Sequence, residues 1–373
     1  MSVPTEPLEN TMAEPLFPCT LVGSYPQPDW LIDKEVLRGR FPPRTRAPEL
    51  WRVPEAFLAE AQADATRVAV QDQLNAGIDI VTDGEIKRES YSNFFANSLQ
   101  GIDFKNPGQA LDRSGEPVKV PRVVGPISRT TPVCVADVRF LRSLTAKPIK
   151  YTIPGPFTMA QQAQNEYYKT DRECALAYAA AVNEEIKDLF AAGADVVQLD
   201  EPYMQARHAK AEEYGIEALN RAVEGVTGKT CVHICFGYAA LIHHRPGAYQ
   251  FLPQLAKSNI DQISIETAQS NLACEVLREL PDKEIVLGVI DLSTTKIETV
   301  NEVKERVKRA LAHCDAERII LAPDCGMKYL SREVAFGKLW AMCLAAKELR
   351  REFPSEHKAR RNGRSRYRLA TPR

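Results

Sequence analysis

The residues His233 and Cys235 form the first pattern in this sequence that could carry chemistry. They lie two positions apart within the apolar run 230–237, which reads as a buried strand. Side chains two apart on a strand point to the same face, so the imidazole and the thiol would lie side by side. Such a pair is half of a tetrahedral site for zinc, which commonly binds nitrogen and sulfur ligands. By itself the pair is also compatible with a His and a Cys that only fill the core.

Two more candidate ligands stand at the ends of later apolar runs. Glu266 lies in the run 262–267, and Cys325 lies in the run 318–326. If these runs are parallel strands of one sheet, their carboxyl ends bring the side chains to the same rim. We therefore predict a zinc site formed by His233, Cys235, Glu266 and Cys325.

Acidic side chains end two other apolar runs. Asp83 and Glu85 follow the second run of the chain, and Asp200 and Glu201 follow the fourth. Any single carboxylate of this kind reads as part of a solvated loop. Several of them at one rim, beside a cation of charge two, would hold a positively charged group such as the ammonium of an amino acid.

The turn at Gly23-Ser24 has the opposite character. A small turn exposes backbone N–H groups and a hydroxyl, which could receive a carboxylate. The predicted substrate-binding residues are Gly23, Ser24, Glu85 and Asp200. Of these, Glu85 and Asp200 are the predicted catalytic residues, because they would orient the substrate amine.

The ligand set predicts the type of reaction. Two thiolates already neutralise a zinc ion, so this centre is poorly suited to activating water. A substrate thiol bound to it would lose its proton and remain a thiolate, which is a good nucleophile toward an alkyl donor. Glu266 would be the most weakly held ligand and could yield its place to the incoming sulfur. The predicted chemistry is alkylation of a thiol on an amino-acid-like substrate.

Apolar runs alternate with longer amphipathic stretches along most of the chain, and this rhythm must position these residues. The runs read as strands at residues 20–25, 79–84, 149–156, 195–202, 230–237, 262–267, 284–291 and 318–326. Helices are predicted at residues 54–76, 173–192, 301–312 and 333–349. Eight such units predict an α/β fold of the (β/α)₈ TIM barrel class, with its active site at the carboxyl ends of the strands.

Three segments depart from this rhythm. Residues 1–18 are rich in Pro and Glu and read as a lead-in to a single barrel domain at residues 19–352. Residues 102–135 read as an excursion after the second strand, in the form of a hairpin that could cover the mouth of the barrel. Residues 353–373 read as a disordered basic tail, to which we assign no nucleic-acid function.

Composition places the chain in a cellular compartment. It has 373 residues, a net charge of -1 and nine cysteines, and no run of about 18 apolar residues that could span a membrane. The first residues lack the basic start and apolar core of a secretory signal. We therefore expect a cytoplasmic protein with no membrane partner, whose cysteines are metal ligands or thiols. Cys231 lies too deep in its strand to be a predicted ligand, and the six others read as packing or surface thiols.

Seven short motifs together resemble the C-terminal catalytic barrel of cobalamin-independent methionine synthase, from about residue 18 to residue 350. They are Gly23-Ser24-Tyr25-Pro26-Gln27, Asp83-Gly84-Glu85, Gly155-Pro156-Phe157-Thr158, Gln198-Leu199-Asp200-Glu201-Pro202, His233-Ile234-Cys235, Ile265-Glu266-Thr267 and Pro323-Asp324-Cys325-Gly326. The resemblance implies a zinc methyltransferase of amino-acid biosynthesis, in a short stand-alone form, that converts homocysteine to methionine. It further implies that the four predicted ligands bind zinc, that Ser24 meets the homocysteine carboxylate, and that Glu85 and Asp200 bind its amino group.

Departures from the family concern the methyl donor. Long enzymes of the family carry a second, N-terminal barrel that helps to bind polyglutamylated folate, and 373 residues leave no room for it. The family's His after strand seven, which assists protonation of the folate, is replaced by Ser293 in Asp291-Leu292-Ser293. The donor therefore stays open between methyltetrahydrofolate and a methylcorrinoid, including one carried by a corrinoid protein.

Two other functions stay open at this point. Short relatives that add the sulfonate thiol coenzyme M to an epoxide share these motifs, and Arg88 and Lys328 could supply cations for such a substrate. A binding protein, or a decarboxylase of a corrinoid pathway, could use the same scaffold without a metal. Zinc content distinguishes this last class from both thiolate functions.

Overall fold

A six-stranded parallel sheet, in the order β3-β5-β6-β7-β8-β9, is the centre of the fold. The computed structural model describes residues 15–39, 42, 44–113, 115–238 and 248–353. The strands are β3 (Lys150–Pro154), β5 (Val196–Asp200), β6 (Lys229–His233), β7 (Gln262–Glu266), β8 (Glu284–Ile290) and β9 (Ile319–Pro323). They coincide with the third to eighth predicted strands and are buried almost throughout. The predicted α/β class with parallel strands is therefore confirmed.

The first two predicted strands are not ladder strands. Isolated parallel bridges pair Cys19 with Leu321 of β9 and Thr20 with Ile80, and a third pairs Val81 with Ile149, next to β3. Residues 19–20 and 80–81 thus lie between β9 and β3, in the order expected for a (β/α)₈ barrel. The prediction of full strands at 20–25 and 79–84 was wrong, because these segments leave the sheet early to reach the pocket described below.

Side chains take over the pairing where these two segments leave the sheet. The Thr20 hydroxyl donates to the Ile80 carbonyl at 2.9 Å, and the Thr82 hydroxyl donates to the Gly23 carbonyl at 3.0 Å. The backbone then turns at Gly84 and Glu85, whose φ angles are +68° and +54°. Left-handed backbone of this kind ends an extended segment.

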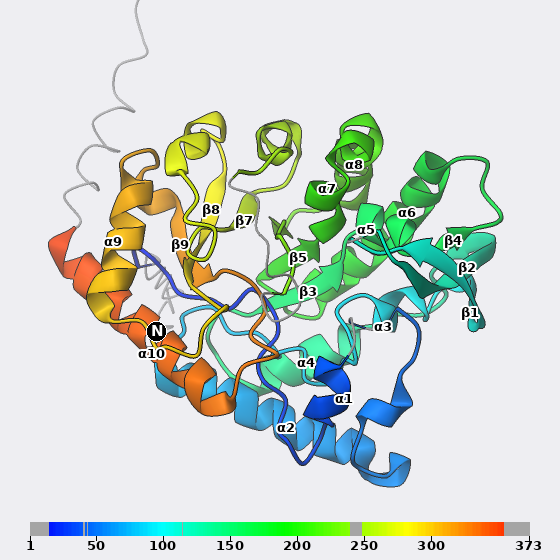
Figure 1. Ribbon diagram of the computed structural model, residues 1–373, viewed down its shortest axis with the longest axis horizontal. Helices are drawn as coiled ribbons and strands as arrows, with labels where there is room; N and C mark the ends of the chain where they lie inside the picture. The colour runs from blue at the N-terminus through cyan, green and yellow to red at the C-terminus, as the bar shows by residue number, and fades with distance from the viewer. Residues whose placement is uncertain (1–14, 40–41, 43, 114, 239–247, 354–373) are drawn as a thin grey trace, which may run out of the picture.

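Helices cover the outer face of the strands, with α2 and α10 on one side and α6 and α8 on another (Figure 1). They are α1 (Lys34–Arg38), α2 (Glu55–Ala76), α3 (Asn93–Ala96), α4 (Val135–Leu144), α5 (Pro156–Gln161), α6 (Asp171–Ala191), α7 (Pro202–Ala206), α8 (His208–Ala222), α9 (Val300–Leu311) and α10 (Arg332–Glu352). Short 3₁₀ helices are η1 (Pro48–Leu50), η2 (Leu252–Lys257), η3 (Cys274–Glu279) and η4 (Ala316–Arg318). The four predicted helices are confirmed as α2, α6, α9 and α10. Sequence signals set their ends: Thr299 and Glu302 form a capping box before α9, and Gly77 ends α2 with a φ of +94°.

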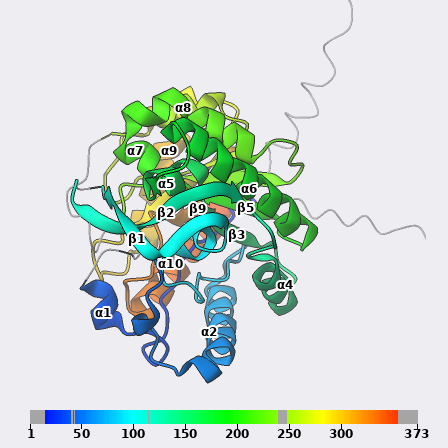
Figure 2. The ribbon, with the colours of Figure 1, turned by 90° about the vertical axis from the view of Figure 1, so that its right-hand side faces the viewer.

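The predicted excursion after the second barrel segment is a β-hairpin. Its strands are β1 (Gln100–Leu111) and β2 (Pro117–Ser128), and the short strand β4 (Gln164–Asn165) pairs with β2 in parallel. Figure 2 shows this hairpin in front of the parallel strands and beside α5 and α6. Its turn contains Arg113, which reaches the pocket at the carboxyl ends of the strands.

The predicted lead-in at 1–18 and the predicted tail at 353–373 lie almost wholly outside the described residues, so these boundaries stay predictions. None of the helices formed by the described residues is long and apolar enough to cross a membrane.

One charged side chain lies within the strands without a partner. Lys150, the first residue of β3, is 1% exposed, and its Nζ has no hydrogen-bond partner. Burial lowers the pKa of this ammonium from 10.5 to about 8, although the thiol of Cys231 and the carboxyl groups of Asp200 and Glu85 oppose the shift. Below the pKa of the folded protein the charged form is buried, which costs stability.

We predict that Lys150→Met raises the free energy of unfolding at pH 7 by about 2 to 3 kcal/mol, as expected for a depressed amine pKa. In the wild type, stability should rise between pH 8 and 10.5, since the unfolded chain binds the proton more tightly there. This rise in the free energy of unfolding should be smaller in Lys150→Met. Urea unfolding at several pH values between 8 and 10.5 measures the difference. Lys147, whose Nζ donates to the Ile78 carbonyl, provides the control substitution Lys147→Met, which should bring no gain. A less stable Lys150→Met protein would contradict the prediction.

Candidate metal and substrate site

Three of the four predicted metal ligands meet at the carboxyl ends of the strands. Ligand atoms of His233, Cys235 and Cys325 lie within 4.8 Å of one another, and all three side chains are buried. His233 is the last residue of β6, and Cys325 lies two residues beyond the end of β9. Our prediction that Cys235 shares a strand with His233 was wrong, because β6 ends at His233. The chain after the strand brings its sulfur to the same point.

The His233 ring is oriented for metal binding. Its Nδ1 lies 2.9 Å from the Ser264 hydroxyl on the neighbouring strand β7, which fixes the ring. Its Nε2 is buried and has no hydrogen-bond partner. A buried polar atom without a partner is costly unless a ligand satisfies it, and a ring nitrogen beside two thiols is suited to a soft divalent cation. The residues therefore fit a metal ion of the zinc type.

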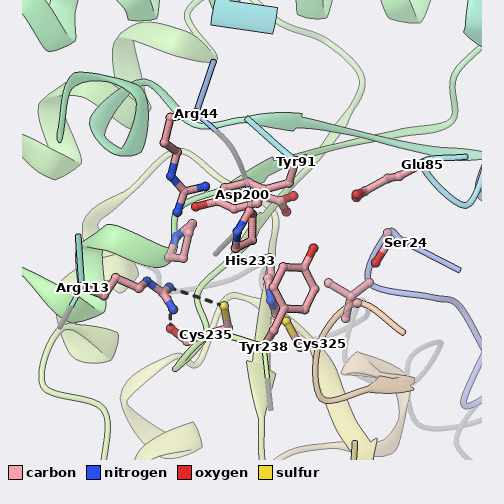
Figure 3. Close-up of a pocket in the computed structure, with 16 residues that line it drawn as sticks. Ser24, Arg44, Glu85, Tyr91, Arg113, Asp200, His233, Cys235, Tyr238 and Cys325 are labelled. Atoms are coloured by element: carbon pink, nitrogen blue, oxygen red, sulfur yellow. Dashed lines mark hydrogen bonds between the residues drawn. The ribbon is translucent and has the colours of Figure 1, made fainter. Parts of the chain in front are cut away.

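The thiol of Cys235 is held in a cationic environment. Arg113 Nη2 donates to Cys235 Sγ at 3.7 Å and to its carbonyl at 3.4 Å (Figure 3). A hydrogen bond with Cys325 holds the pKa of the Cys235 thiol well below its usual range, and Arg113 and His233 lower it further against the effect of burial. A thiolate, the form that binds metals, is thus favoured at this position.

Glu266, the fourth predicted ligand, is not part of this cluster. It ends β7, is completely buried, and its Oε1 accepts a hydrogen bond from the Phe236 backbone N–H at 3.0 Å. Its own N–H donates to the Tyr249 hydroxyl at 2.8 Å. These contacts place Glu266 against the chain that carries Cys235. Its role as a metal ligand stays a prediction.

The predicted substrate residues line the same pocket as the metal cluster. They are Gly23, Ser24, Glu85 and Asp200. The Ser24 hydroxyl is buried and has no hydrogen-bond partner, so it is available to a ligand. A Cβ atom at Gly23 would lie 2.3 Å from Glu85 Oε1, which means that only glycine lets Glu85 approach this turn.

The two predicted catalytic carboxylates differ in their surroundings. Glu85 Oε1 accepts a hydrogen bond from the Thr152 hydroxyl at 3.0 Å and lies 3.7 Å from Arg88 Nη1. Asp200 Oδ1 accepts a hydrogen bond from Gln198 Nε2 at 2.8 Å. Burial raises the pKa of Asp200 to about 7, and the nearby charge of Glu85 raises it as well. A ligand ammonium between them would bring the compensating positive charge.

Two other acids at strand ends organise the backbone instead. Glu201 accepts hydrogen bonds from the N–H groups of Phe157 and Thr158, at the start of α5. Asp324 accepts three, from the backbone of the loop 267–269. Burial raises the pKa of Glu201 to about 8 and that of Asp324 to about 6. Neither residue lines the pocket, so their position at strand ends reflects loop structure.

The cations expected for a sulfonate substrate do not face the pocket. Arg88 is 3% exposed, with its guanidinium carbon 4.2 Å from the Phe94 ring centroid and 4.9 Å from that of Tyr151. Lys328 Nζ donates to the backbone carbonyls of Arg88 and Glu89. Both side chains thus have structural partners, and the observation that supported the coenzyme M alternative does not hold.

Sequence reasoning missed four residues that line the pocket, namely Arg44, Tyr91, Arg113 and Tyr238. Arg113 could have been found, because a hairpin that covers a barrel mouth must place its turn there. Arg44 and Tyr91 lie in segments without apolar periodicity, which give no signal. Tyr238 lies three residues after Cys235, but a tyrosine near a strand end reads as a core residue.

Comparison with known proteins identifies the family. Residues 17–348 match the family described as "Cobalamin-independent synthase, Catalytic domain". This chain belongs to that family. The methionine synthase of Saccharolobus solfataricus is 35% identical over 348 residues, which cover 91% of this chain and 96% of that relative. The methionine synthase of Sulfurisphaera tokodaii is 34% identical over 344 residues, 92% of this chain and 95% of that relative.

Solved structures of cobalamin-independent synthases agree with this assignment. A B12-independent methionine synthase from Shewanella sp. W3-18-1, determined in complex with selenomethionine, is 37% identical and superimposes with a TM-score of 0.82. The match covers 90% of this chain and 98% of the Shewanella chain. A second structure, from Listeria monocytogenes, has a TM-score of 0.68 at 22% identity, and this likeness concerns the fold. The family resemblance predicted from the motifs is therefore confirmed.

We predict that Cys235→Ser and Cys325→Ser each reduce bound zinc from about one ion per chain to nearly none, without unfolding the protein. Loss of one thiolate from a small ligand set removes a major part of the binding free energy. Ser264→Ala should retain zinc but bind it roughly 10- to 100-fold more weakly, since it frees the His233 ring. Elemental analysis and competition with a chelator measure both effects.

The matched control is Cys231→Ser. Like Cys235 and Cys325, Cys231 is buried, and it lies within β6. Its thiol donates to Gln198 Oε1 at 3.7 Å and is not part of the cluster. This variant should hold zinc like the wild type. If Cys235→Ser also kept a full complement of zinc, our assignment of the ligands would be wrong.

Proposed function

We propose that this protein is a zinc-dependent methyltransferase that methylates the thiol of homocysteine to form methionine, with methyltetrahydrofolate or a methylcorrinoid as donor. The observation that carries the proposal is a single pocket with two different ends. One end holds the cluster of His233, Cys235 and Cys325, the other presents Ser24 and Glu85, and Asp200 lies beside His233 on the neighbouring strand. A ligand that fits both ends has a sulfur and an amino-acid group a few bonds apart.

The residues divide the substrate between them. A zinc ion held by His233, Cys235 and Cys325, with Glu266 as the proposed fourth ligand, would lower the pKa of a bound substrate thiol. The Ser24 hydroxyl, which lacks a protein partner, would donate to the substrate carboxylate. The carboxylates of Glu85 and Asp200 would accept hydrogen bonds from the substrate ammonium and orient the chain that leads to the sulfur.

The transfer converts the substrate thiol to a thioether. The thiol loses its proton to solvent, and the thiolate sulfur then forms a bond to the methyl carbon. The bond between that carbon and the donor breaks at the same time, and its electron pair stays on the donor: on the cobalt of a methylcorrinoid, or on N5 of methyltetrahydrofolate, which takes up a proton from solvent. Placing sulfur and methyl group in line is the main contribution that residues of a fixed pocket can make.

The names of the relatives support this assignment. Saccharolobus solfataricus and Sulfurisphaera tokodaii proteins that span nearly the same length are named methionine synthases. The Shewanella structure contains selenomethionine, the selenium analogue of the proposed product. Coenzyme M addition to an epoxide is not favoured, since Arg88 and Lys328, the cations that supported it, do not line the pocket and the relatives are named methionine synthases. We propose a cytoplasmic location from the composition alone.

A donor panel tests the proposed function. Zinc-loaded enzyme is incubated with homocysteine and, in separate reactions, with the mono- and triglutamate forms of 5-methyltetrahydrofolate and with methylcobalamin. Methionine formation from at least one donor is expected and would identify the donor class. Cys325→Ser should form none. If zinc-loaded wild-type enzyme formed no methionine from any of these donors, the proposal would fail.

The raised pKa of Asp200 gives a separate prediction for ligand binding. Methionine has no thiol, so its affinity reports the amino-acid end of the pocket alone. Its dissociation constant should fall as the pH rises through about 7, because the Asp200 carboxyl must lose its proton to bind an ammonium. Asp200→Asn should bind methionine at least 10-fold more weakly at pH 8 and show no such pH dependence, as measured by calorimetry between pH 6 and 8. An unchanged pH profile in this variant would count against the assigned role.

A further inference from the structure

Arg44 is a cation in the pocket that the proposed function does not use. Arg44 is only 9% exposed and lines the same pocket as Asp200 and Cys235. The guanidinium carbon lies 5.1 Å from the centroid of the Tyr91 ring. Its Nη1 is buried and has no hydrogen-bond partner, and among the described residues no carboxylate pairs with it.

The segment that carries Arg44 is held firmly in place. Glu89, which is 4% exposed, accepts hydrogen bonds from the Ala47 backbone N–H at 2.6 Å and from Trp51 Nε1 at 3.2 Å. It also pairs with Arg46, whose Nη2 lies 3.1 Å from Glu89 Oε1. The neighbouring arginine thus has a counterion within the protein, whereas Arg44 is fixed beside the pocket without one.

The position of Arg44 separates it from the amino-acid end. Figure 3 shows Arg44 and Arg113 on one side of His233 and Asp200, and Ser24 and Glu85 on the other. Arg113 already donates to the Cys235 sulfur and carbonyl. Arg113 also keeps an unpaired Nε, but its terminal Nη2 is engaged by Cys235, whereas at Arg44 a terminal nitrogen, Nη1, stays available to a ligand.

A buried guanidinium nitrogen without a hydrogen-bond partner is unfavourable, and an incoming anion would relieve that cost. Arginine binds carboxylates and phosphates through two parallel hydrogen bonds, and such pairs are strong where water is excluded. The Tyr91 ring supports one face of the guanidinium and holds its plane. The local chemistry therefore selects a planar or tetrahedral oxyanion, since an amine or an uncharged group would leave the charge unpaired.

We propose that Arg44 determines specificity for the methyl donor by binding an anionic group on that donor. The inference rests on the proposed function, because it names the chemical class of the second substrate of the same pocket. The acceptor needs only the sulfur and amino-acid ends, so the anion at Arg44 belongs to the other substrate. A carboxylate of a glutamyl tail and the phosphate of a corrinoid nucleotide both provide this chemistry.

Direct binding measurements test the proposal without any turnover. Calorimetry with zinc-loaded protein compares wild type, Arg44→Gln and Arg44→Lys, with 5-methyltetrahydrofolate as mono- or triglutamate, methylcobalamin and methionine as separate probes. Arg44→Gln should bind at least one donor probe 10-fold or more weakly while its affinity for methionine stays within twofold. Arg44→Lys should lie between, since it keeps the charge but loses the two-pronged geometry. The affected probe distinguishes the carboxylate from the phosphate source.

The matched control is Arg67→Gln. Arg67 on α2 also places its guanidinium carbon 5.1 Å from an aromatic ring, that of Phe140, but it pairs with Asp64 at 2.5 Å on the surface. This control should bind every probe like the wild type.

Two results would overturn the proposal. One is weaker binding of methionine by Arg44→Gln, which would assign Arg44 to the acceptor. The other is equal binding of every donor probe by wild type and Arg44→Gln, including the case in which neither binds. The calorimetry measures affinity and not catalysis. It therefore decides on the role of Arg44 even if the donor panel yields no methionine.

Discussion

The unsatisfied Nε2 of His233 is the constraint on which the rest of the site depends. It is buried beside two thiols, and the Ser264 hydroxyl on the adjacent strand fixes the ring in this position. Such an arrangement is unfavourable in an empty protein core and becomes favourable when a cation binds. Three strands, β6, β7 and β9, must therefore end at the same level, which a parallel sheet covered by helices provides.

Acidic residues at the strand ends look alike in the sequence, but the structure shows that some bind loop backbone and others line the pocket. Glu201 and Asp324 accept hydrogen bonds from backbone N–H groups and fix the loops around the pocket. Glu85 and Asp200 have side-chain partners and face the cavity. Glu201 and Asp324 therefore stabilise the loops, whereas Glu85 and Asp200 are placed to bind a ligand.

The sequence was sufficient for features that rest on local patterns. Apolar runs located β3 and β5 to β9, amphipathic stretches located α2, α6, α9 and α10, and the position of His233 and Cys325 at strand ends predicted that they meet. Features set by tertiary contacts could not be predicted. The first two barrel segments pair through single bridges because threonine side chains replace backbone pairing there. Glu89 and Asn93 hold the backbone that follows Arg44, at Ala47 and Thr45, and no periodic pattern records these contacts.

The distribution of charge in the pocket explains how two substrates could be ordered on one metal centre. Glu85 lies with Ser24, Arg44 and Arg113 lie on the opposite side, and His233 and Asp200 lie between them (Figure 3). A zwitterion that entered in reverse would place its ammonium near Arg44 and Arg113, where like charges repel. An anionic donor at the opposite end would meet Glu85 and Asp200 and be repelled as well. If the proposed substrates bind here, electrostatics would thus fix the direction of both molecules and place their reacting atoms toward the middle.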